Sequence, residues 1–268
     1  MNPQKIFLTG ASSGIGQALA RAYAAQGATL GLVGRREDAL RAFASSLPNP
    51  AAVRVYAVDV RDADAIHAAA ADFLAHVGCP DVVIANAGIS VGTVASERED
   101  LELFRMVMDT NWFGTLTTFQ PFLGPMRAQP PGPDGWRGTL VGIASVAGVR
   151  GLPGGGAYSA SKSAVIKLLE SLRLEQSRER IRVVTIAPGY IRTPMTKHNP
   201  YKMPFLMDAD VFAHKAIARI AAGTRFKVIP WQMGAVASVL HVMPRWLYDA
   251  LFRRAPRKPR KPGQSRSA

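Results

Sequence analysis

The stretch Thr9-Gly10-Ala11-Ser12-Ser13-Gly14-Ile15-Gly16 joins a short apolar run, Lys5–Thr9, to an Ala-rich segment with helical periodicity, Gly14–Gln26. Glycines permit a tight turn in which backbone N–H groups approach a pyrophosphate, and the following helix adds the positive end of its dipole. A glycine motif is weak evidence by itself. A strand before it and a helix after it, however, are the context that a dinucleotide-binding turn requires. The spacing is G-x-x-x-G-x-G rather than G-x-G-x-x-G.

The same alternation of strand and helix continues along the chain. Further strands are predicted at 28–33, 53–58, 81–85, 139–144, 182–186 and 225–229, and further helices at 37–46, 62–77, 101–126, 157–177 and 210–222. The strands are continuous apolar runs, which is typical of parallel strands buried on both faces of a sheet. The predicted fold class is therefore α/β: a single Rossmann-like, doubly wound domain with a seven-stranded, mainly parallel sheet flanked by helices.

The rhythm of strands leaves no gap for a second domain. We expect residues 1–230 to form the Rossmann-fold domain, 231–254 an apolar helical extension of it, and 255–268 a basic, disordered tail. The irregular stretch 190–210 is long enough to be a functional lid. Its lid portion is apolar and adaptable, with these side chains: Met195, Tyr201, Met203, Phe205, Leu206 and Met207.

Composition excludes several classes of protein. Hydrophobic residues make up 48% of the chain and charged residues 19%, which argues against disorder. The single cysteine, Cys79, cannot form an intrachain disulfide and is expected to be a small packed residue. The first strand begins at Lys5, which leaves no room for a signal peptide, and no stretch of about 18 apolar residues predicts a membrane span. We therefore expect a cytoplasmic protein.

The histidines give no sign of a metal site. They are scattered, and none lies at metal-ligand spacing from a cysteine or a carboxylate. They are expected on the surface or in the lid: His67, His76, His198, His214 and His241.

Further motifs, in a fixed order, accompany the glycine turn. They are Asp59-Val60 after the third strand, Asn86-Ala87-Gly88 after the fourth, Asn111, Ser145, Tyr158-Ser-Ala-Ser-Lys162, Pro188-Gly189 and Thr193. With the turn TGxxxGIG, this set resembles the short-chain dehydrogenase/reductase family over residues 5–230. The resemblance implies a nicotinamide cofactor, a small-molecule carbonyl or alcohol substrate, and assembly into a homodimer or homotetramer.

Tyr158 and Lys162 are the candidate acid/base pair. Their i,i+4 spacing in a helix places both side chains on one face. A nearby ammonium favours a phenolate, so we expect Lys162 to lower the pKa of Tyr158 towards neutrality. The resemblance implies the same role for the tyrosine and adds that the lysine hydrogen-bonds the nicotinamide ribose. The alternative is a surface Tyr/Lys pair on an amphipathic helix.

Ser145 and Asn111 complete the candidate catalytic set. The Ser145 hydroxyl could hold the substrate oxygen, and the alternative is a serine that caps a turn. The family usually has two serines in a row, and here the first is Ala144. The resemblance implies that Asn111 supports a water linking Lys162 to solvent. Its alternative is a structural asparagine bonded to nearby backbone.

The cofactor type is predicted from Arg35 and Arg36. NAD-preferring relatives place an acid at the end of the second strand, where this chain has Gly34, and two guanidinium groups suit the 2′-phosphate of NADP(H). The alternative is two solvated arginines at a helix start. Asp59 would accept a hydrogen bond from adenine, or would cap the next helix. The full set of expected cofactor residues is Gly10, Ser12, Ser13, Gly14, Ile15, Gly16, Arg35, Arg36, Asp59, Val60, Asn86, Ala87, Gly88, Tyr158, Lys162, Pro188, Gly189 and Thr193.

The end of the chain is apolar and then basic. Residues 228–254 carry many apolar side chains, and Pro244 predicts two short helices rather than one. These helices would pack on the domain itself or on a sister subunit, or they would lie on a membrane surface as a peripheral contact. Seven basic residues follow Asp249, and they would strengthen binding to anionic lipid: Arg253, Arg254, Arg257, Lys258, Arg260, Lys261 and Arg266. No motif predicts nucleic-acid binding.

The sequence thus predicts an NADP(H)-dependent oxidoreductase that moves a hydride between nicotinamide and a carbonyl or secondary alcohol carbon. Tyr158 would act as the general acid/base, and the substrate would be lipophilic. The alternative is a catalytically silent protein on the same fold that senses nucleotides or associates with membranes, because a fold does not fix a function.

Overall fold

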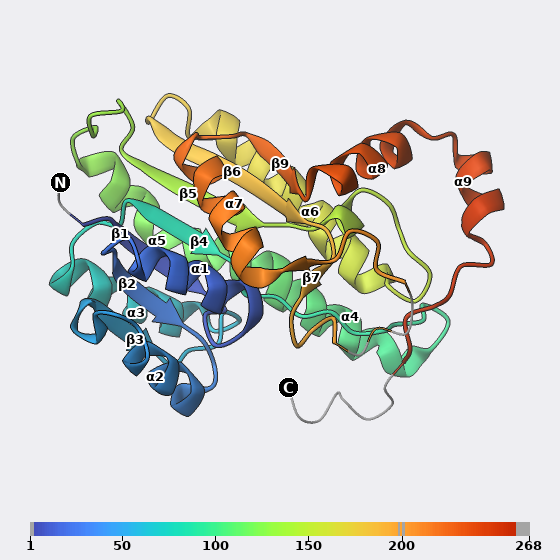
Figure 1. The fold of residues 1–268 in the computed structure, drawn as a ribbon, viewed down its shortest axis with the longest axis horizontal. Helices are drawn as coiled ribbons and strands as arrows, with labels where there is room; N and C mark the ends of the chain where they lie inside the picture. The colour runs from blue at the N-terminus through green and yellow to red at the C-terminus, as the bar shows by residue number, and fades with distance from the viewer. Residues whose placement is uncertain (1–2, 198, 200–201, 261–268) are drawn as a thin grey trace.

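Seven parallel strands form the central sheet of the computed structural model, which describes residues 3–197, 199 and 202–260 (Figure 1). Their order is β3-β2-β1-β4-β5-β6-β9. The strands are β1 (Lys5–Thr9), β2 (Thr29–Val33), β3 (Val53–Tyr56), β4 (Val82–Ala85), β5 (Gly138–Ile143), β6 (Ile181–Pro188) and β9 (Phe226–Ile229). Every neighbouring pair runs parallel. The predicted fold class is confirmed.

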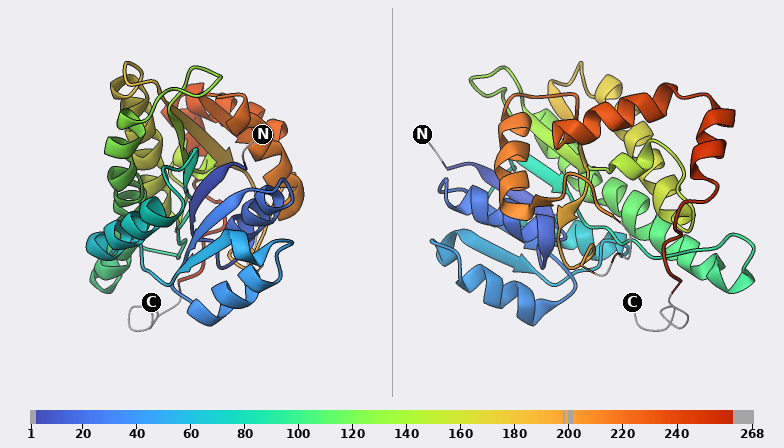
Figure 2. Two further views of the ribbon diagram at one scale, coloured as in Figure 1. Left: turned by 90° about the vertical axis from the view of Figure 1, so that its left-hand side faces the viewer. Right: turned by 45° about the vertical axis from the view of Figure 1, so that its right-hand side comes forward.

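Helices cover both faces of this sheet, as Figure 2 shows. One face carries α1 (Gly14–Ala24), α2 (Glu37–Ser45) and α7 (Ala209–Ala221), and the other carries α3 (Ala63–His76), α5 (Gly114–Ala128) and α6 (Gly156–Glu175). Successive residues of β1 point to opposite faces, so Ile6 and Leu8 join one core cluster and Phe7 joins the other. Burial on both faces explains why the strands are apolar throughout.

The long helix predicted at 101–126 is interrupted. It consists of α4 (Leu101–Met108), a π-helical turn η3 (Asp109–Phe113) and α5, which continues past Pro121 and Pro125. A π turn inserts an extra residue and rotates the helix that follows, and such turns are frequent at functional sites. Asn111 lies within this turn.

The order of strands reverses between β1 and β4, because β2 and β3 lie on one side of β1 while β5, β6 and β9 lie beyond β4. In open α/β sheets, ligands bind beyond the carboxyl ends of the strands at such a switch point. The loop after β6 returns over this edge and contains a small parallel sheet of β7 (Ile191–Arg192) and β8 (Met207–Asp208). The lid segment predicted as irregular is therefore bounded by paired strands.

Two short helices follow β9, as Pro244 predicted. They are α8 (Trp231–Val242) and α9 (Arg245–Phe252), and Pro244 is the N-cap of the second. Met233 and Ala237 are the buried residues of α8, and α9 has none. No helix among the described residues is long and apolar enough to span a membrane.

The tail predicted to be disordered differs from that expectation over its first residues. Residues 255–260 run back along the body of the domain and make hydrogen bonds with it (Figure 1). Residues 261–268 lie outside the described part of the chain.

Candidate active site

The glycine turn after β1 has the backbone geometry that only glycine tolerates. Gly10 and Gly14 have positive φ angles of 69° and 56°. A Cβ on Gly16 would lie 2.1 Å from the carbonyl oxygen of Gly10, so the start of α1 can pack this closely only without a side chain. Ser13 is the N-cap of α1, and its side chain makes no capping hydrogen bond. The turn thus forms a cradle that a phosphate would fit.

Asn86 ties this turn to the end of β4. Its side-chain Nδ2 donates to the carbonyl oxygens of Thr9 at 3.0 Å and Gly10 at 3.2 Å. The Thr9 hydroxyl in turn accepts from the backbone N–H groups of Asn86 and Ala87, at 3.2 and 3.3 Å. The Asn86-Ala87-Gly88 motif therefore fixes the turn in addition to edging the cavity beside it.

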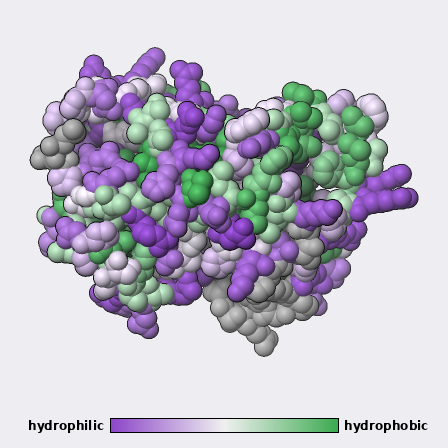
Figure 3. Space-filling view, viewed as in Figure 1, coloured by the Kyte–Doolittle hydropathy of each residue, from purple (hydrophilic) through white to green (hydrophobic). Residues whose placement is uncertain are grey.

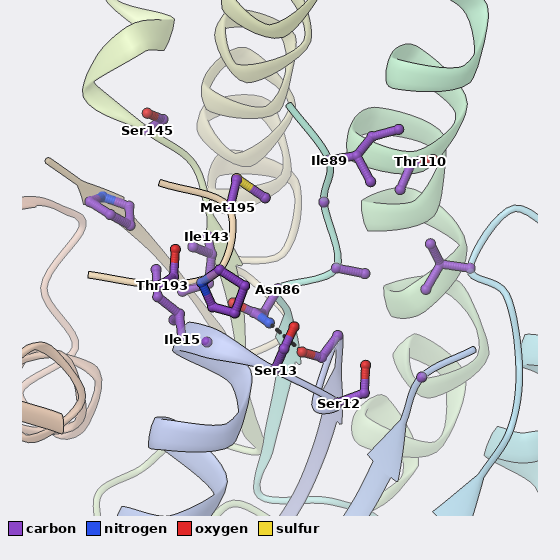
Figure 4. Close-up of a pocket in the computed structure, with 18 of the residues that line it drawn as sticks. Ser12, Ser13, Ile15, Asn86, Ile89, Thr110, Ile143, Ser145, Thr193 and Met195 are labelled. Atoms are coloured by element: carbon purple, nitrogen blue, oxygen red, sulfur yellow. Dashed lines mark hydrogen bonds between the residues drawn. The ribbon is translucent and has the colours of Figure 1, made fainter. Parts of the chain in front are cut away.

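A cavity of about 350 Å³ lies beyond the carboxyl ends of the strands. Figure 4 shows side chains from the turn, from the loop after β4 and from the lid around it. Every predicted cofactor residue except Gly16 lines this cavity. Thr193 belongs to the lid and lies against the turn, since a Cβ on Gly14 would be 3.2 Å from the Thr193 side chain.

Ten lining residues were outside the predicted cofactor and catalytic sets, although Met195 was predicted as a lid side chain and Gly34 as the position that decides the cofactor type: Gly34, Val58, Ile89, Thr110, Ile143, Ala144, Ile191, Pro194, Met195 and Thr196. Several of them directly follow a strand, which is a signal that could have found them. Thr110 is different, because the π turn brings it to the cavity and no pattern in the sequence marks that turn.

Charged side chains gather at one end of the cavity, where Arg35, Arg36 and Asp59 lie. Arg36 donates to the backbone oxygen of Ser12 at 3.0 Å, which holds its guanidinium at the glycine turn. Arg35 Nη1 lies 3.9 Å from Asp59 Oδ2. Both arginines are exposed and Arg36 is the N-cap of α2, so the alternative of solvated arginines at a helix start stays open beside the cofactor role.

Asp59 is held by Arg61 rather than by the next helix. Burial would raise the pKa of Asp59, but hydrogen bonds from the Arg61 side chain and backbone lower it below its usual value. Asp62, not Asp59, caps α3 by accepting from the backbone N–H of Ala65 at 3.0 Å. The capping alternative for Asp59 is therefore wrong.

Ser145 and Tyr158 lie side by side at the inner end of the cavity. Ser145 follows β5, and its Oγ accepts a hydrogen bond from the backbone N–H of Ala147 at 3.1 Å, so it caps the short helix η4 (Val146–Gly148). Its hydroxyl also interacts with Tyr158. Ser145 therefore caps a turn and edges the cavity at once.

The pKa of Tyr158 differs from the expectation. Burial raises it, and the interaction with the Ser145 hydroxyl offsets only part of that rise. Lys162 is also buried, at 4% exposure, and burial lowers its pKa to about 8. Its Nζ donates to the carbonyl oxygen of Ile143 at 2.7 Å. Without a cofactor, Lys162 thus does not lower the pKa of Tyr158, because desolvation dominates both groups.

Asn111 is completely buried and does not line the cavity. Its Nδ2 donates to Ile89 O at 3.0 Å and Ser161 Oγ at 2.9 Å, and its Oδ1 accepts from Ile89 N at 2.8 Å. These contacts join the π turn to the loop after β4 and to α6. These hydrogen bonds are the ones that a structural role of Asn111 requires. A water that links Lys162 to solvent beside Asn111 stays a prediction.

A second cavity, of about 490 Å³, adjoins the first. The two share Ser145, Tyr158, Gly189, Met195 and Thr196 as lining residues. Of the apolar lid side chains, Met195 alone lines the described part of either cavity, while Phe205 is exposed and Met207 packs on the core. Tyr201 lies outside the described residues.

Metal chemistry has no candidate ligands in the described part of the chain, where no three His, Cys, Asp or Glu side chains cluster. The described histidines are exposed, and His198 lies outside the described residues. Cys79 is partly buried against the core, and burial raises the pKa of its thiol to about 11. It is therefore a poor nucleophile near neutral pH.

Comparison with known proteins adds to this geometry. The family described as short chain dehydrogenase matches residues 4–203. A protein of Myxococcus xanthus described as an uncharacterized oxidoreductase is 38% identical over 259 residues, which cover 95% of this chain and 98% of that protein.

Two solved structures share the fold. A short chain dehydrogenase from Burkholderia cenocepacia, in complex with NADP, superposes with a TM-score of 0.78 at 22% identity, covering 94% of this chain and 98% of that one. An alcohol dehydrogenase from Thermococcus sibiricus, complexed with 5-hydroxy-NADP, gives a TM-score of 0.73 at 26% identity, covering 85% and 95%. With the matched sequence motifs and the parallel sheet, these findings identify the chain as an oxidoreductase of the short-chain dehydrogenase family.

Proposed function

We propose that the protein is an NADP(H)-dependent carbonyl reductase or alcohol dehydrogenase in which Tyr158 is the general acid/base. The observation that carries this proposal is the meeting of two cavities at Ser145 and Tyr158. One cavity contains the glycine cradle and suits a dinucleotide. The other is largely apolar and suits a substrate whose reacting carbon would lie at the junction.

The residues of the first cavity fit a nicotinamide dinucleotide. The turn from Gly10 to Gly16 would hold the pyrophosphate, and Asp59 would accept from the adenine amino group. Arg35 and Arg36 would pair with a 2′-phosphate, which favours NADP(H) over NAD(H). The compounds named for the two solved neighbours, NADP and 5-hydroxy-NADP, support this choice. When bound, NADPH supplies the hydride.

Side chains of the protein would donate and accept the proton of the reaction. The raised pKa keeps Tyr158 protonated near neutral pH, and a protonated phenol is the form that donates to a carbonyl oxygen. Ser145 Oγ would hold that oxygen and stabilise the charge that develops on it. Lys162 is charged below about pH 8 and would orient the nicotinamide ribose. Alcohol oxidation would use the same groups in the reverse order.

The surface of α8 and α9 supports a peripheral membrane contact. Trp231, Val239, Val242, Trp246 and Leu251 are between 57% and 78% exposed, and Figure 3 shows apolar side chains gathered over these helices. Three exposed basic residues follow directly, Arg253, Arg254 and Arg257. A cytoplasmic protein that touches an anionic membrane surface through this segment, and that assembles into a homodimer or homotetramer, completes the proposal.

Substitution of Tyr158 by Phe tests the proposed function. The ring and its packing stay, while the oxygen that carries the proton is lost. Turnover of NADPH with a panel of aldehydes and ketones should fall by about 10² to 10⁴. NADPH binding, measured by quenching of tryptophan fluorescence, should change little. Tyr248→Phe, at a partly buried tyrosine of α9 that lines neither cavity, is the matched control and should keep its turnover.

A fall of only a few-fold in Tyr158→Phe would refute the proposed role of the tyrosine. NADPH binding without turnover of any carbonyl or alcohol by the wild-type protein would instead favour the catalytically silent nucleotide sensor.

A further inference from the structure

The segment 255–260, here called the C-terminal strap, runs beside the second cavity. The backbone N–H of Lys258 donates to the carbonyl oxygen of Pro153 at 3.4 Å. A Cβ on Gly92 would lie 2.1 Å from Pro259 O, and one on Gly154 would lie 2.7 Å from Lys258 N. Two glycines therefore leave room for the strap. The backbone of the strap packs against the backbone of the domain, which fixes where the side chains of the strap enter the second cavity.

A buried carboxylate fastens the end of the strap. Asp100 is 3% exposed and accepts from the backbone N–H of Val94 at 2.7 Å. Arg260 donates to both of its oxygens, through Nε at 3.0 and 3.1 Å and Nη2 at 2.9 Å. A bidentate Arg–carboxylate pair constrains direction as well as distance, so it sets the position of the residues just before it.

Lys258 brings a positive charge to the second cavity. Its Nζ donates to Ser90 O at 2.9 Å and Ser90 Oγ at 2.6 Å, and lies 6.0 Å from the centre of the Tyr158 ring. Lys258 and Lys202 are the charged side chains among the described residues that line this cavity, and the others are polar or apolar. The cavity is therefore apolar over most of its wall and positive where the strap meets it.

From these contacts we infer that Lys258, held by the strap, selects a substrate that carries a negatively charged group, a carboxylate or a phosphate ester, on an otherwise apolar carbonyl compound. The inference rests on the proposed function, since it assigns the second cavity to the substrate of that reaction. Lys258 recognises the charge through charge-assisted hydrogen bonds, and Lys202 adds to the positive potential from the lid side. Arg260 is a positioning residue, because it acts by fixing Lys258.

The chemistry of the wall favours an anionic amphiphile over a neutral one. An apolar chain gains from burial against residues such as Leu152 and Phe252, which line this cavity. An anion would accept charge-assisted hydrogen bonds from the ammonium, which are stronger than those that a neutral hydroxyl accepts. A cationic compound would be rejected by repulsion from both lysines.

The test measures binding, so it does not depend on turnover. Decanoate, decyl phosphate and decanol, each below its aggregation concentration, are titrated calorimetrically into the full chain saturated with NADP⁺. The two anions should bind at least about tenfold more tightly than decanol. Lys258→Met should remove most of that difference while leaving decanol binding unchanged. Lys258→Arg should restore it.

Two further variants separate local from general effects. Arg257→Met removes a neighbouring strap charge that is exposed and does not line the cavity, so the preference for anions should persist. Arg260→Gln leaves Lys258 in place but releases the strap, so it should reduce the preference as Lys258→Met does. Comparison of decanoate with decyl phosphate shows which anion the site prefers.

Equal affinity for the anions and decanol in the wild-type protein would overturn the inference. A preference that survives Lys258→Met, or that is lost equally in Arg257→Met, would overturn it as well, because net positive charge would then explain the binding. None of these three results bears on the proposed role of Tyr158. Absence of any NADPH-dependent turnover, with the anion preference intact and sensitive to Lys258, would reject the proposed function and not the binding site.

Discussion

Burial of Lys162 should make the stability of the protein depend on pH in a window above neutrality. Its pKa falls from 10.5 to about 8 in the folded state because the ammonium is desolvated. Between these values the unfolded chain binds a proton that the folded chain does not. Stability therefore rises with pH through this window, and below about pH 8 the full penalty is present.

The size of the effect follows from the shift. A difference of one pKa unit corresponds to about 1.4 kcal/mol, so burying the charged lysine costs about 3 kcal/mol near pH 7. The same linkage leaves about 1 kcal/mol near pH 10, because the folded lysine is neutral there and removing the proton from the unfolded one costs little so close to its pKa. Lys162→Met removes this titration. The free energy of unfolding of wild type relative to Lys162→Met should therefore rise by about 2 kcal/mol between these two pH values.

Urea unfolding without cofactor, followed by far-ultraviolet circular dichroism, measures this difference. The free energy of unfolding of wild type relative to Lys162→Met is compared at pH 7 and pH 10. This comparison removes the contributions of the hydrogen bond to Ile143 and of the gain in apolar packing, since neither depends strongly on pH. Lys167→Met is the matched control: Lys167 lies on the same helix but is exposed and pairs with Glu170. A wild-type-minus-Lys162→Met difference that stays flat from pH 7 to 10 would show that the lysine is not desolvated in the apoprotein.

Three further predictions follow from other parts of the molecule. Arg35→Ala and Arg36→Ala should each weaken NADPH binding at least about tenfold while changing NADH binding little, and equal losses in fluorescence titrations would show that they do not bind the 2′-phosphate. Phe122 is fully buried with its ring 4.7 Å from that of Phe7, so Phe122→Ala should lower the free energy of unfolding by about 3–5 kcal/mol in urea; a loss below about 1 kcal/mol would contradict its place in the core. Co-sedimentation with anionic liposomes should be strong at low salt, weaken towards about 1 M salt, and weaken again in Trp246→Ser; no binding at low salt would remove the proposed membrane contact.

The fold was predictable because its signals are local and repeated. Apolar runs mark the strands, and the turn from Gly10 to Gly16 marks the first crossover. Positions just after strands 1, 3 and 4 then come together because parallel strands share one edge. Most of the cavity-lining residues that are predicted to contact a cofactor were found in this way.

The parts that the sequence did not reveal depend on contacts between distant segments. The π turn at Asn111 is one example, because no motif in the sequence marks where a helix takes up an extra residue. The pKa of Tyr158 is another. Spacing alone brought Lys162 close and predicted a lower value, whereas burial of both groups, which no spacing shows, raises it.

The C-terminal strap shows the same limit in its strongest form. Pro, Arg and Lys in residues 255–260 match the composition of a disordered tail, and that composition says only that the segment cannot build its own core. The strap is held by contacts with the rest of the domain instead. Arg260 meets Asp100, a carboxylate whose burial near Val94 would be costly without a partner. The pairing acts across 160 residues of sequence. A polar segment can thus be held in place by an oppositely charged residue elsewhere in the fold. Here the buried Asp100, rather than the composition of the tail, explains the position of the strap.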